Sequence, residues 1–432
     1  MSLWQVPDHP FPIDATVTIP GSKSHTARAL LLAAIADGPS RISGALRCRD
    51  TSLMRAALTS LGASITDRDN GDLVIQPIPR DAIIHGDRVD IDCGLAGTVM
   101  RFLPAIVAAL GISARFDGDA AARLRPMGPL LEALHALGVS ISYEGEAGFL
   151  PFTLDGKAGA VPGGVIEVDT SASSQFLSAL LLAAPLFDQP TAIRAVGSVI
   201  SAPHIDMTVE ALRGRGITID KLGEYHWEVT PGRPNGGNSH VEPDLSNAGV
   251  FLAAAMLTAG QIHIPSWPLV TTQAGDYWRT LLADLGASIS LDEGGLTLIG
   301  PGAGAYSGLD IDMRDFGELV PTLAAILLFA SSPSRIRGVG HLRGHETDRL
   351  AALADSVTRL GGTLKEESDG ISITPTSLSG ATLRAWGDHR LATFAAIVGL
   401  IVPGVIIDEI EATSKTLPDF PQMWESMLAK AH

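Results

Sequence analysis

Residues 346–375 read ETDRLAALADSVTRLGGTLKEESDGISITP, and this stretch shows the pattern on which the fold of the chain is built. Its first half predicts an amphipathic helix, because apolar residues recur at helical spacing along one face. That apolar stripe consists of Leu350, Leu353, Val357 and Leu360. Gly361 is suited to ending the helix, and two strand-like runs follow it on either side of a turn. The stretch therefore predicts a surface helix followed by a strand pair.

The same pattern of helix, glycine and strand pair occurs five times along the chain. The helix-ending glycines are Gly62, Gly138, Gly216, Gly286 and Gly361, with spacings of 76, 78, 70 and 75 residues. Upstream lies a second kind of helix that is apolar almost all round, such as RLATFAAIVGL at 390–400, and such a helix must be buried on every side. The repeat therefore reads strand, buried helix, strand, surface helix and two strands, and we expect six copies of it.

The sixth copy ends in a helix, before any final strand pair. The N-terminal strands expected at Leu3–Val6 and Ala15–Ile19 are free to supply that pairing. The fold class is therefore α/β, with two similar domains that each contain three repeated βαβαββ units around buried helices.

The two domains are expected at residues 21–239 and at residues 1–20 plus 240–432. The chain is expected to cross between them near Pro20–Gly21 and in Pro231–His240. The second of these stretches is rich in Gly, Asn and Pro and has the composition of a linker.

Composition excludes several classes of protein. With 46% apolar and 18% charged residues in 432, the chain can bury large cores. The longest near-apolar run, Leu391–Val402, is well short of the ~20 residues that a membrane span requires. No secretory signal is evident at the start, and Cys48 and Cys93 are the only cysteines, so we expect a soluble cytoplasmic protein without membrane contact. The net charge of −16 argues against a nucleic-acid partner.

The expected buried helices open with polar residues, and helix N-termini offer unpaired N–H groups that bind anions. Four cations enter these helices: Lys23, Arg28, Arg101 and Arg390. Burying them is costly unless anions meet them, which predicts sites for small phosphorylated anions in a cleft between the two halves.

Other charged residues, taken one at a time, do not indicate a binding site. Arg125 precedes a proline, Glu346 and Arg349 are one helical turn apart, and Lys415 lies at a strand-to-loop junction. Each alone is interpreted as a solvated surface charge. His341 and His345 are four residues apart, but the HExxH pattern is absent and no third ligand is marked, so no metal site is predicted.

Seven motifs in series resemble the enolpyruvyl transferases over essentially the whole chain. They are PGSKSHTARALLLAA, LAGTVMRF, RLRPMG, SSQFLSALL, HETDRL, GDHRLA and SKTLPDF. The resemblance implies an inside-out α/β barrel in each domain and transfer of the carboxyvinyl group of phosphoenolpyruvate (PEP) to the 5-hydroxyl of shikimate 3-phosphate. The resemblance further implies that this reaction releases phosphate and belongs to the biosynthesis of chorismate and the aromatic amino acids. The resemblance also implies a monomer that needs no metal or organic cofactor and is a target of glyphosate.

The resemblance also implies the roles of individual residues. Those expected around PEP are Lys23, Gly97, Arg125, Gln175, Arg349, Arg390 and Lys415. Those expected around shikimate 3-phosphate, with residues 21–239 as its main domain, are Lys23, Ser24, Arg28, Ser173, Ser174, Gln175, Ser201, Glu318, His341 and His345. Lys23, Glu318 and Glu346 are the expected catalytic residues. As a working assignment, Glu318 is the base toward the 5-hydroxyl, and Glu346, helped by Lys23, donates a proton to PEP.

Some positions depart from the family's pattern. Leu95 stands where many relatives have Asn, His204 where they have Tyr, and Glu318 where they have Asp. His341 and His345 replace an Asn and a Lys, which bears on the pH profile because His titrates near neutrality.

Three alternatives remain open. The first is transfer of the same group to UDP-N-acetylglucosamine, although that sister enzyme carries a Cys on the loop that here reads DGDAAARLR (117–125). The second is a nucleic-acid-processing relative with the same repeat, such as an RNA phosphate cyclase, and the third is a phosphate-binding relative that has lost activity.

Overall fold

The computed structural model describes residues 2–79, 88–156 and 161–429. The chain forms two compact units, Gly21–Val241 and Met1–Pro20 with Glu242–His432, called here the first and the second unit. Compared with the predicted domains, His240 and Val241 belong to the first unit. The reason is that His240 pairs with Ser43 in a parallel sheet, and the Val241 N–H donates to the Ser43 carbonyl at 2.9 Å.

The first unit contains three repeats, each with one buried and one surface helix. Its helices are α1 (Lys23–Ala34), α2 (Arg49–Ser60), α3 (Gly97–Ala109), α4 (Gly128–Ala136), α5 (Gln175–Ala183) and α6 (Pro203–Arg213), with 3₁₀ turns η1 (Ala122–Leu124) and η3 (Ala184–Leu186). Its strands are β3 (Ser40–Ser43), β4 (Ser64–Asp67), β5 (Leu73–Gln76), β6 (Val89–Asp92), β7 (Ala114–Asp117), β8 (Ser140–Tyr143), β9 (Phe152–Asp155), β10 (Gly164–Asp169), β11 (Thr191–Val196), β12 (Ile219–Gly223), β13 (His226–Val229) and β14 (Gly237–His240).

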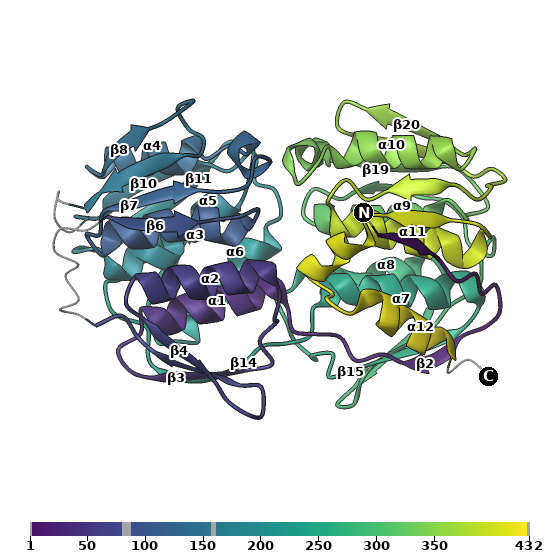
Figure 1. Ribbon diagram of the computed structural model, residues 1–432, viewed down its shortest axis with the longest axis horizontal. Helices are drawn as coiled ribbons and strands as arrows, with labels where there is room; N and C mark the ends of the chain where they lie inside the picture. Colours follow the sequence, from purple (N-terminus) through teal and green to yellow (C-terminus); the bar gives the residue numbers. More distant parts are fainter. Residues whose placement is uncertain (1, 80–87, 157–160, 430–432) are drawn as a thin grey trace. The chain divides into compact units, whose positions relative to one another are not determined.

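These strands form three sheets of one topology, with orders β14-β3-β5-β4, β6-β7-β9-β8 and β10-β11-β13-β12. In each sheet the first two strands are parallel and the other pairs are antiparallel. Figure 1 shows α1 and α2 beside one another over the sheet of β14, β3 and β4. The first repeat, in which these helices lie, thus packs both of them against one sheet.

The second unit repeats this plan. Its helices are α7 (Leu245–Thr258), α8 (Trp278–Asp284), α9 (Val320–Leu327), α10 (Arg349–Arg359), α11 (His389–Ile401) and α12 (Phe420–Ala429), with 3₁₀ turns η4 (Ala274–Tyr277), η5 (Gly317–Leu319), η6 (Gly340–Gly344) and η7 (Ile410–Lys415). Its strands are β1 (Leu3–Gln5), β2 (Asp14–Thr16), β15 (Gln261–Pro265), β16 (Ser288–Asp292), β17 (Gly295–Ile299), β18 (Asp310–Asp312), β19 (Ser334–Arg337), β20 (Thr363–Glu367), β21 (Gly370–Thr374), β22 (Thr382–Arg384) and β23 (Ile406–Asp408). The sheet orders are β16-β17-β15-β2, β18-β19-β21-β20 and β1-β23-β22.

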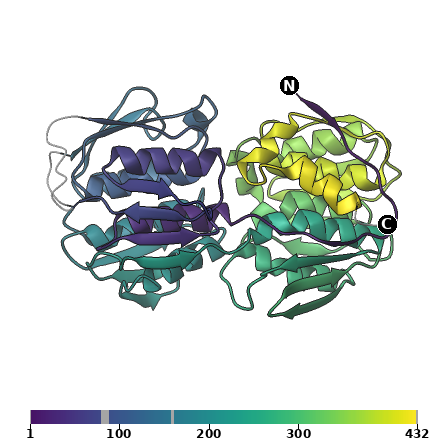
Figure 2. The same ribbon diagram turned by 60° about the horizontal axis from the view of Figure 1, so that its bottom comes forward.

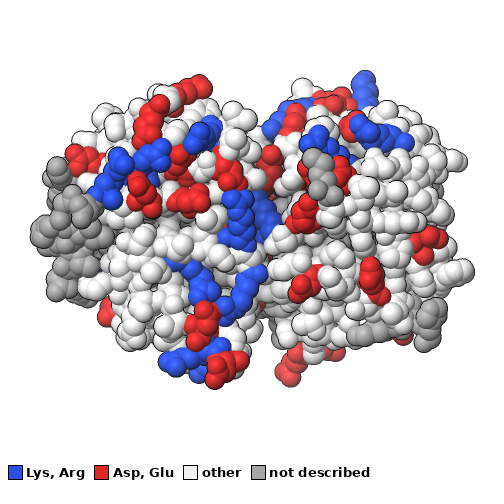
Figure 3. All heavy atoms as spheres, viewed as in Figure 1, with Lys and Arg blue, Asp and Glu red and all other residues white. Residues whose placement is uncertain are grey.

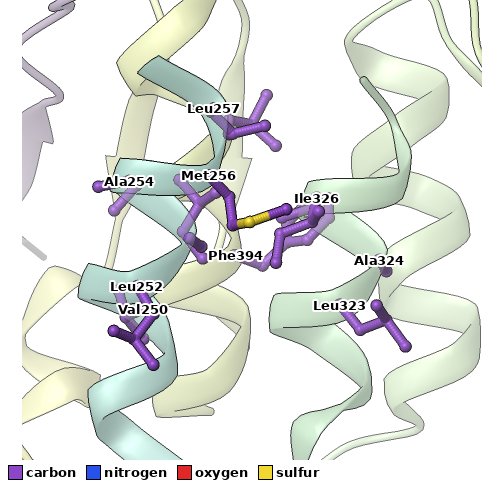
Figure 4. Packing of buried hydrophobic residues seen from close by; sticks show 14 of the residues in the cluster. Val250, Leu252, Ala254, Met256, Leu257, Leu323, Ala324, Ile326 and Phe394 are labelled. Atoms are coloured by element: carbon purple, nitrogen blue, oxygen red, sulfur yellow. The ribbon is translucent and has the colours of Figure 1, made fainter. Parts of the chain in front are cut away.

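The apolar helices lie inside the units, as predicted. Nearly every side chain of α3, α7 and α11 is buried. Figure 4 shows Met256 of α7, Ile326 of α9 and Phe394 of α11 pointing toward one another in the core of the second unit. Helices without a polar face therefore form the centre around which each unit's sheets are arranged.

The predicted helix-ending glycines are confirmed by their backbone conformation. Their φ angles are all positive: Gly62 106°, Gly138 90°, Gly216 79°, Gly286 89° and Gly361 76°. This left-handed conformation lets the chain leave a helix and is adopted most easily by glycine.

The two N-terminal strands do not both complete the sixth repeat. β1 pairs antiparallel with β23 of that repeat, as expected. β2 instead pairs in parallel with β15 and is the leading strand of the fourth repeat. Figure 2 shows the purple N-terminal segment running along the second unit. The stretch Pro231–His240 is likewise more than a linker, because its last four residues form β14, the leading strand of the first repeat. The first and fourth repeats thus take their leading strands from beside the points where the chain crosses between units.

Among the helices that the structure describes, none combines the length and the apolar character that a membrane crossing would need.

The close packing of the N-terminal segment against α11 gives a stability prediction. A Cβ at Gly399 would lie 2.7 Å from Cβ of Val6, whereas one at Gly38 would have no neighbour within 4 Å among the described residues. Ala normally favours a helix over Gly by about 1 kcal/mol. We nevertheless expect Gly399→Ala to lower the free energy of unfolding by about 1–3 kcal/mol, because it overpacks this contact.

The measurement is urea unfolding followed by tryptophan fluorescence, with Gly38→Ala as the matched control. Gly38→Ala is expected to be neutral or slightly stabilising. A Gly399→Ala protein at least as stable as the parent would contradict this account of how residue 6 is anchored.

Candidate active site

In the first unit, the starts of two buried helices meet around hydrogen-bonded side chains. Arg101, in the second turn of α3, donates to Ser173 Oγ at 3.1 Å and to Gln175 Oε1 at 3.0 Å. Ser173 Oγ also accepts from the backbone N–H of Gln175 at 3.2 Å, and Ser173 and Ser174 are buried just before α5. The predicted residues Ser173 and Gln175 are therefore brought together with Arg101, whose guanidinium lies 5.2 Å from the Phe176 ring centroid.

Arg125 is the most informative charge in this unit. It is only 6% exposed, and within the part of the chain that the structure describes, its Nε and Nη1 atoms have no hydrogen-bond partner. A Cβ at Gly97 would lie 3.3 Å from Gln175 Oε1 and 3.4 Å from Arg125 Nη1, so these three residues adjoin. The interpretation of Arg125 as a solvated surface charge is wrong, and its buried guanidinium is suited to meeting an anion.

Lys23 and Arg28 lie on α1, which is capped by Ser22 through a 3.4 Å bond from the His25 N–H. Lys23 Nζ lies 3.4 Å from Oδ2 of the buried Asp50. Arg28 is 2% exposed and donates to the backbone carbonyls of Ser24 and His204. Since Arg28 Nε also donates to the Thr208 hydroxyl at 2.8 Å, this guanidinium ties α1 to α6.

Ser24 and Ser201 are the remaining predicted residues of the first unit. Ser24 is half-buried in the first turn of α1. Ser201 is half-buried just before α6 and has a φ of 53°, in the region that non-glycine residues rarely adopt. Strained backbone of this kind tends to occur at functional sites.

In the second unit, Glu346 is the centre of a buried network of charges. Its carboxylate accepts from Lys415 Nζ at 2.5 Å and from Arg349 Nη2 at 3.0 Å. Arg349 in turn donates from Nε to Asp388 Oδ2 at 2.7 Å, and Asp388 is fully buried. The interpretation of Glu346, Arg349 and Lys415 as surface charges is therefore wrong. Glu346 also lies before α10 rather than on it. The helix begins at Arg349, and Asp348 caps it by accepting a hydrogen bond from the Ala351 N–H.

Glu318, the other predicted carboxylate, lies on η5. Its Oε1 accepts from the Ser246 hydroxyl at 2.5 Å, and its Oε2 lies 3.9 Å from Nη2 of Arg390. A Cβ at Gly317 would lie 2.6 Å from Nε2 of His341, so that ring packs directly against the backbone beside Glu318. His345 Nδ1 lies 3.8 Å from Glu346 Oε2. The structure thus places both histidines beside the two predicted carboxylates.

At the candidate site of the second unit, the pKa values of His341 and Arg349 are shifted, each with an identifiable cause. Burial lowers the pKa of His341, only partly opposed by the charge of Asp369, so the neutral imidazole is favoured. For Arg349, burial would lower the pKa, but the carboxylates of Asp388 and Glu346 more than offset this and raise it, so the guanidinium stays charged.

Several residues of this site were not predicted. Ser246 and Asp388 occur in the polar helix openings DLSNAG and GDHR, where they could be taken for helix-capping residues. Asp388 does cap α11, since its Oδ1 accepts from the Arg390 N–H at 2.9 Å, and the same carboxylate binds Arg349. Asp50, the partner of Lys23, lies on a surface helix without a distinguishing motif.

The net charge of −16 does not prevent local gatherings of cations. On the face seen in Figure 3, basic and acidic side chains lie among one another over the first unit. Most of the cations described above are buried, so they do not belong to a basic surface patch.

Both units are α/β domains of the same plan, and in each of them buried cations lie in the first two turns of helices or on the loops beside them. The chain belongs to the EPSP synthase (3-phosphoshikimate 1-carboxyvinyltransferase) family, whose sequence model matches residues 7–424. A 3-phosphoshikimate 1-carboxyvinyltransferase of Kocuria rhizophila is 50% identical over 99% of this chain and 96% of its own length. The resemblance to the enolpyruvyl transferases is thereby confirmed.

Solved structures confirm the fold class. An EPSP synthase of Acinetobacter baumannii superposes with a TM-score of 0.81 at 23% identity, covering 98% of both chains. A second structure of EPSP synthase from the same organism gives 0.77 at 23% identity and the same coverage.

Proposed function

We propose that this chain transfers the carboxyvinyl group of PEP to the 5-hydroxyl of shikimate 3-phosphate and releases phosphate. The observation that carries the proposal is the 50% identity, over nearly the whole chain, to a protein named for this reaction. The product serves chorismate and aromatic amino acid biosynthesis. Both cysteines are free and buried, which supports the proposal that the chain acts in the reducing cytoplasm. We further propose that it acts as a monomer and without a cofactor.

We assign PEP to cations of both units. In the first unit these are Lys23 and the buried Arg125, whose Nε and Nη1 have no hydrogen-bond partner among the described residues, with Gly97 and Gln175 beside it. In the second unit they are Arg349, Arg390 and Lys415. PEP carries a phosphate and a carboxylate, and each charge-assisted hydrogen bond to it contributes ~1.5–3 kcal/mol.

We assign shikimate 3-phosphate mainly to the first unit. The residues of the first unit that we assign to this substrate provide hydroxyl, amide and cationic groups: Ser24, Ser173, Ser174, Gln175, Ser201, Lys23 and Arg28. In the second unit we assign Glu318, His341 and His345 to the same substrate, because the two histidines lie beside Glu318 and Glu346. The contacts of Arg28 with α6 support a second role for it, in holding the segment of Ser201 and His204 against α1.

The reaction proceeds by addition and elimination. In the addition, the 5-oxygen loses its proton to a base and bonds to C2 of PEP, while the methylene carbon of PEP takes up a proton. In the elimination, the resulting methyl group returns a proton, the double bond forms again and phosphate leaves with the electron pair of its C–O bond. One group must remove the hydroxyl proton, and another must give and then recover a proton at carbon.

We assign the first role to Glu318 and the second to Glu346, with Lys23 assisting the proton donor. Glu346 accepts hydrogen bonds from Lys415 and Arg349. The Lys415 ammonium group is therefore close enough to exchange a proton with the Glu346 carboxylate. Glu318 accepts from the Ser246 hydroxyl, which fixes the direction of its carboxylate.

A phosphate-release assay tests the proposal. The protein is supplied with PEP and either shikimate 3-phosphate or UDP-N-acetylglucosamine, the acceptor of the alternative reaction. We expect release with the first acceptor only, because the loop between β7 and Arg125 lacks the Cys that characterises the sister enzyme. Release with the nucleotide sugar instead would overturn the proposal.

Substitution of the proposed base gives a sharper prediction. Glu318→Gln keeps an oxygen that can accept from Ser246 but removes the proton acceptor. We expect turnover to fall by ~10²-fold or more, with little change in shikimate 3-phosphate binding. Steady-state kinetics and calorimetric binding measure the two effects.

Glu293→Gln, in the exposed turn between β16 and β17, is the matched control. Near-normal turnover of Glu318→Gln would remove Glu318 from the mechanism.

We also propose that glyphosate competes with PEP beside Gly97. A methyl group at Gly97 would approach Arg125 Nη1 and Gln175 Oε1 to 3.3–3.4 Å, so both side chains must shift slightly. We expect Gly97→Ala to raise the KM for PEP and to weaken inhibition by glyphosate. Inhibition kinetics against PEP measure both constants.

Gly128→Ala is the matched control, since Gly128 is also the first residue of a helix. Of the described residues, its Cβ would meet only Glu132, at 3.8 Å. An unchanged inhibition constant in Gly97→Ala would argue against placing Gly97 at the PEP site.

A further inference from the structure

The turn before α11 has an unusual backbone. Trp386 has a φ of 56° and Gly387 a φ of 65°. A bulky side chain in the left-handed region is strained and persists only where the surrounding structure holds it. The next residue is Asp388, whose buried carboxylate binds Arg349. The position of Asp388 therefore depends on whatever holds this turn.

Glu409 holds the turn from the neighbouring segment. Its Oε2 accepts from the backbone N–H of Gly387 at 3.2 Å and lies 3.7 Å from Nε of Arg384. The Arg384 guanidinium lies over the Trp386 ring, 4.4 Å from the ring centroid. Glu409 itself has a φ of 67°, so the strained residues on both sides of this contact support one another.

Glu409 also marks the start of the segment that carries Lys415. The 3₁₀ turn η7 begins directly after Glu409 and ends at Lys415, whose ammonium binds Glu346. On the other side, Glu409 binds the turn of Asp388, and Asp388 binds Arg349, which also donates to Glu346. Glu409 is thus connected to both cations that bind Glu346. It is connected to Arg349 through the turn of Asp388, and to Lys415 through η7.

We propose that Glu409 is a positioning residue that sets the direction of the two cations at Glu346. The inference rests on the proposed function, in which Glu346 exchanges the proton with PEP. Small displacements of reacting groups reduce rates strongly, so a loosened turn lowers turnover although Glu409 touches no reacting atom.

The hydrogen bond to Gly387, rather than the charge of Glu409, carries this role. The Arg384 side chain is 48% exposed, and ion pairs with such exposed groups contribute little. Two substitutions separate the two possibilities. Glu409→Gln keeps an acceptor at the same distance and removes the charge, whereas Glu409→Asp keeps the charge and withdraws the acceptor from Gly387.

The experiment compares kcat/KM for PEP at saturating shikimate 3-phosphate in the full chain. We expect Glu409→Asp and Glu409→Ala to lower kcat/KM by about tenfold or more, and Glu409→Gln to recover most of that loss. Glu411→Ala is the matched control, because Glu411 lies in the same segment but accepts from Ser2. We expect it to match the parent.

Hydrogen exchange of the peptide that covers residues 385–390 provides a readout independent of turnover. We expect faster exchange in Glu409→Asp and Glu409→Ala, and parental protection in Glu409→Gln and Glu411→Ala. If the parent protein releases no phosphate with shikimate 3-phosphate, the proposed function fails, and this exchange measurement alone then decides whether Glu409 holds the turn.

Three outcomes would overturn the inference. The first is unchanged kcat/KM in Glu409→Ala, and the second is unchanged exchange in the same variant. The third is a Glu409→Gln variant that is more impaired than Glu409→Asp, which would assign the effect to the charge of Glu409 rather than to its hydrogen bond.

Discussion

A buried cation has to be matched by negative charge, and this requirement shapes the candidate site in both units. In the second unit the match is internal, because Arg349 lies between the carboxylates of Asp388 and Glu346. In the first unit Arg125 is equally buried, yet among the described residues its Nε and Nη1 have no hydrogen-bond partner. The first unit therefore keeps a guanidinium available for an anion, whereas the second has a preformed network in which a carboxylate and an ammonium can exchange a proton.

This difference arises from one structural plan used twice. Both units place apolar helices in the centre and polar residues at their starts. At α5 the opening residues are serines and a glutamine, and Arg101 donates to the neutral oxygens of Ser173 and Gln175. At α11 the opening residue is Asp388, which brings a full negative charge into the core. The residue at the start of a buried helix thus decides whether the adjacent cation meets a carboxylate there or the neutral oxygens of a serine and a glutamine.

The repeat could be read from the sequence because each of its elements carries a local signal. Helical periodicity separates surface from buried helices, and glycine marks each helix end. The leading strand β14 has no such signal, since GNSH is short, polar and without alternation. A strand was expected near β2, at Ala15–Ile19, but DAT is too short to indicate its pairing partner. The pairing partners of both strands are far away in sequence, and only the need of each repeat for a parallel leading strand explains them.

The same limit applies to the site. The cations and the two carboxylates could be named from motifs, but the burial of Arg125 and Lys415 could not, because a lone charge on a loop is usually solvated. Asp388 was overlooked for a physical reason, since a helix-capping role accounts locally for an Asp at that position. Its second role depends on Arg349, 39 residues away. A residue that satisfies a local rule can therefore still serve a distant partner, and the sequence alone shows only the first of these roles.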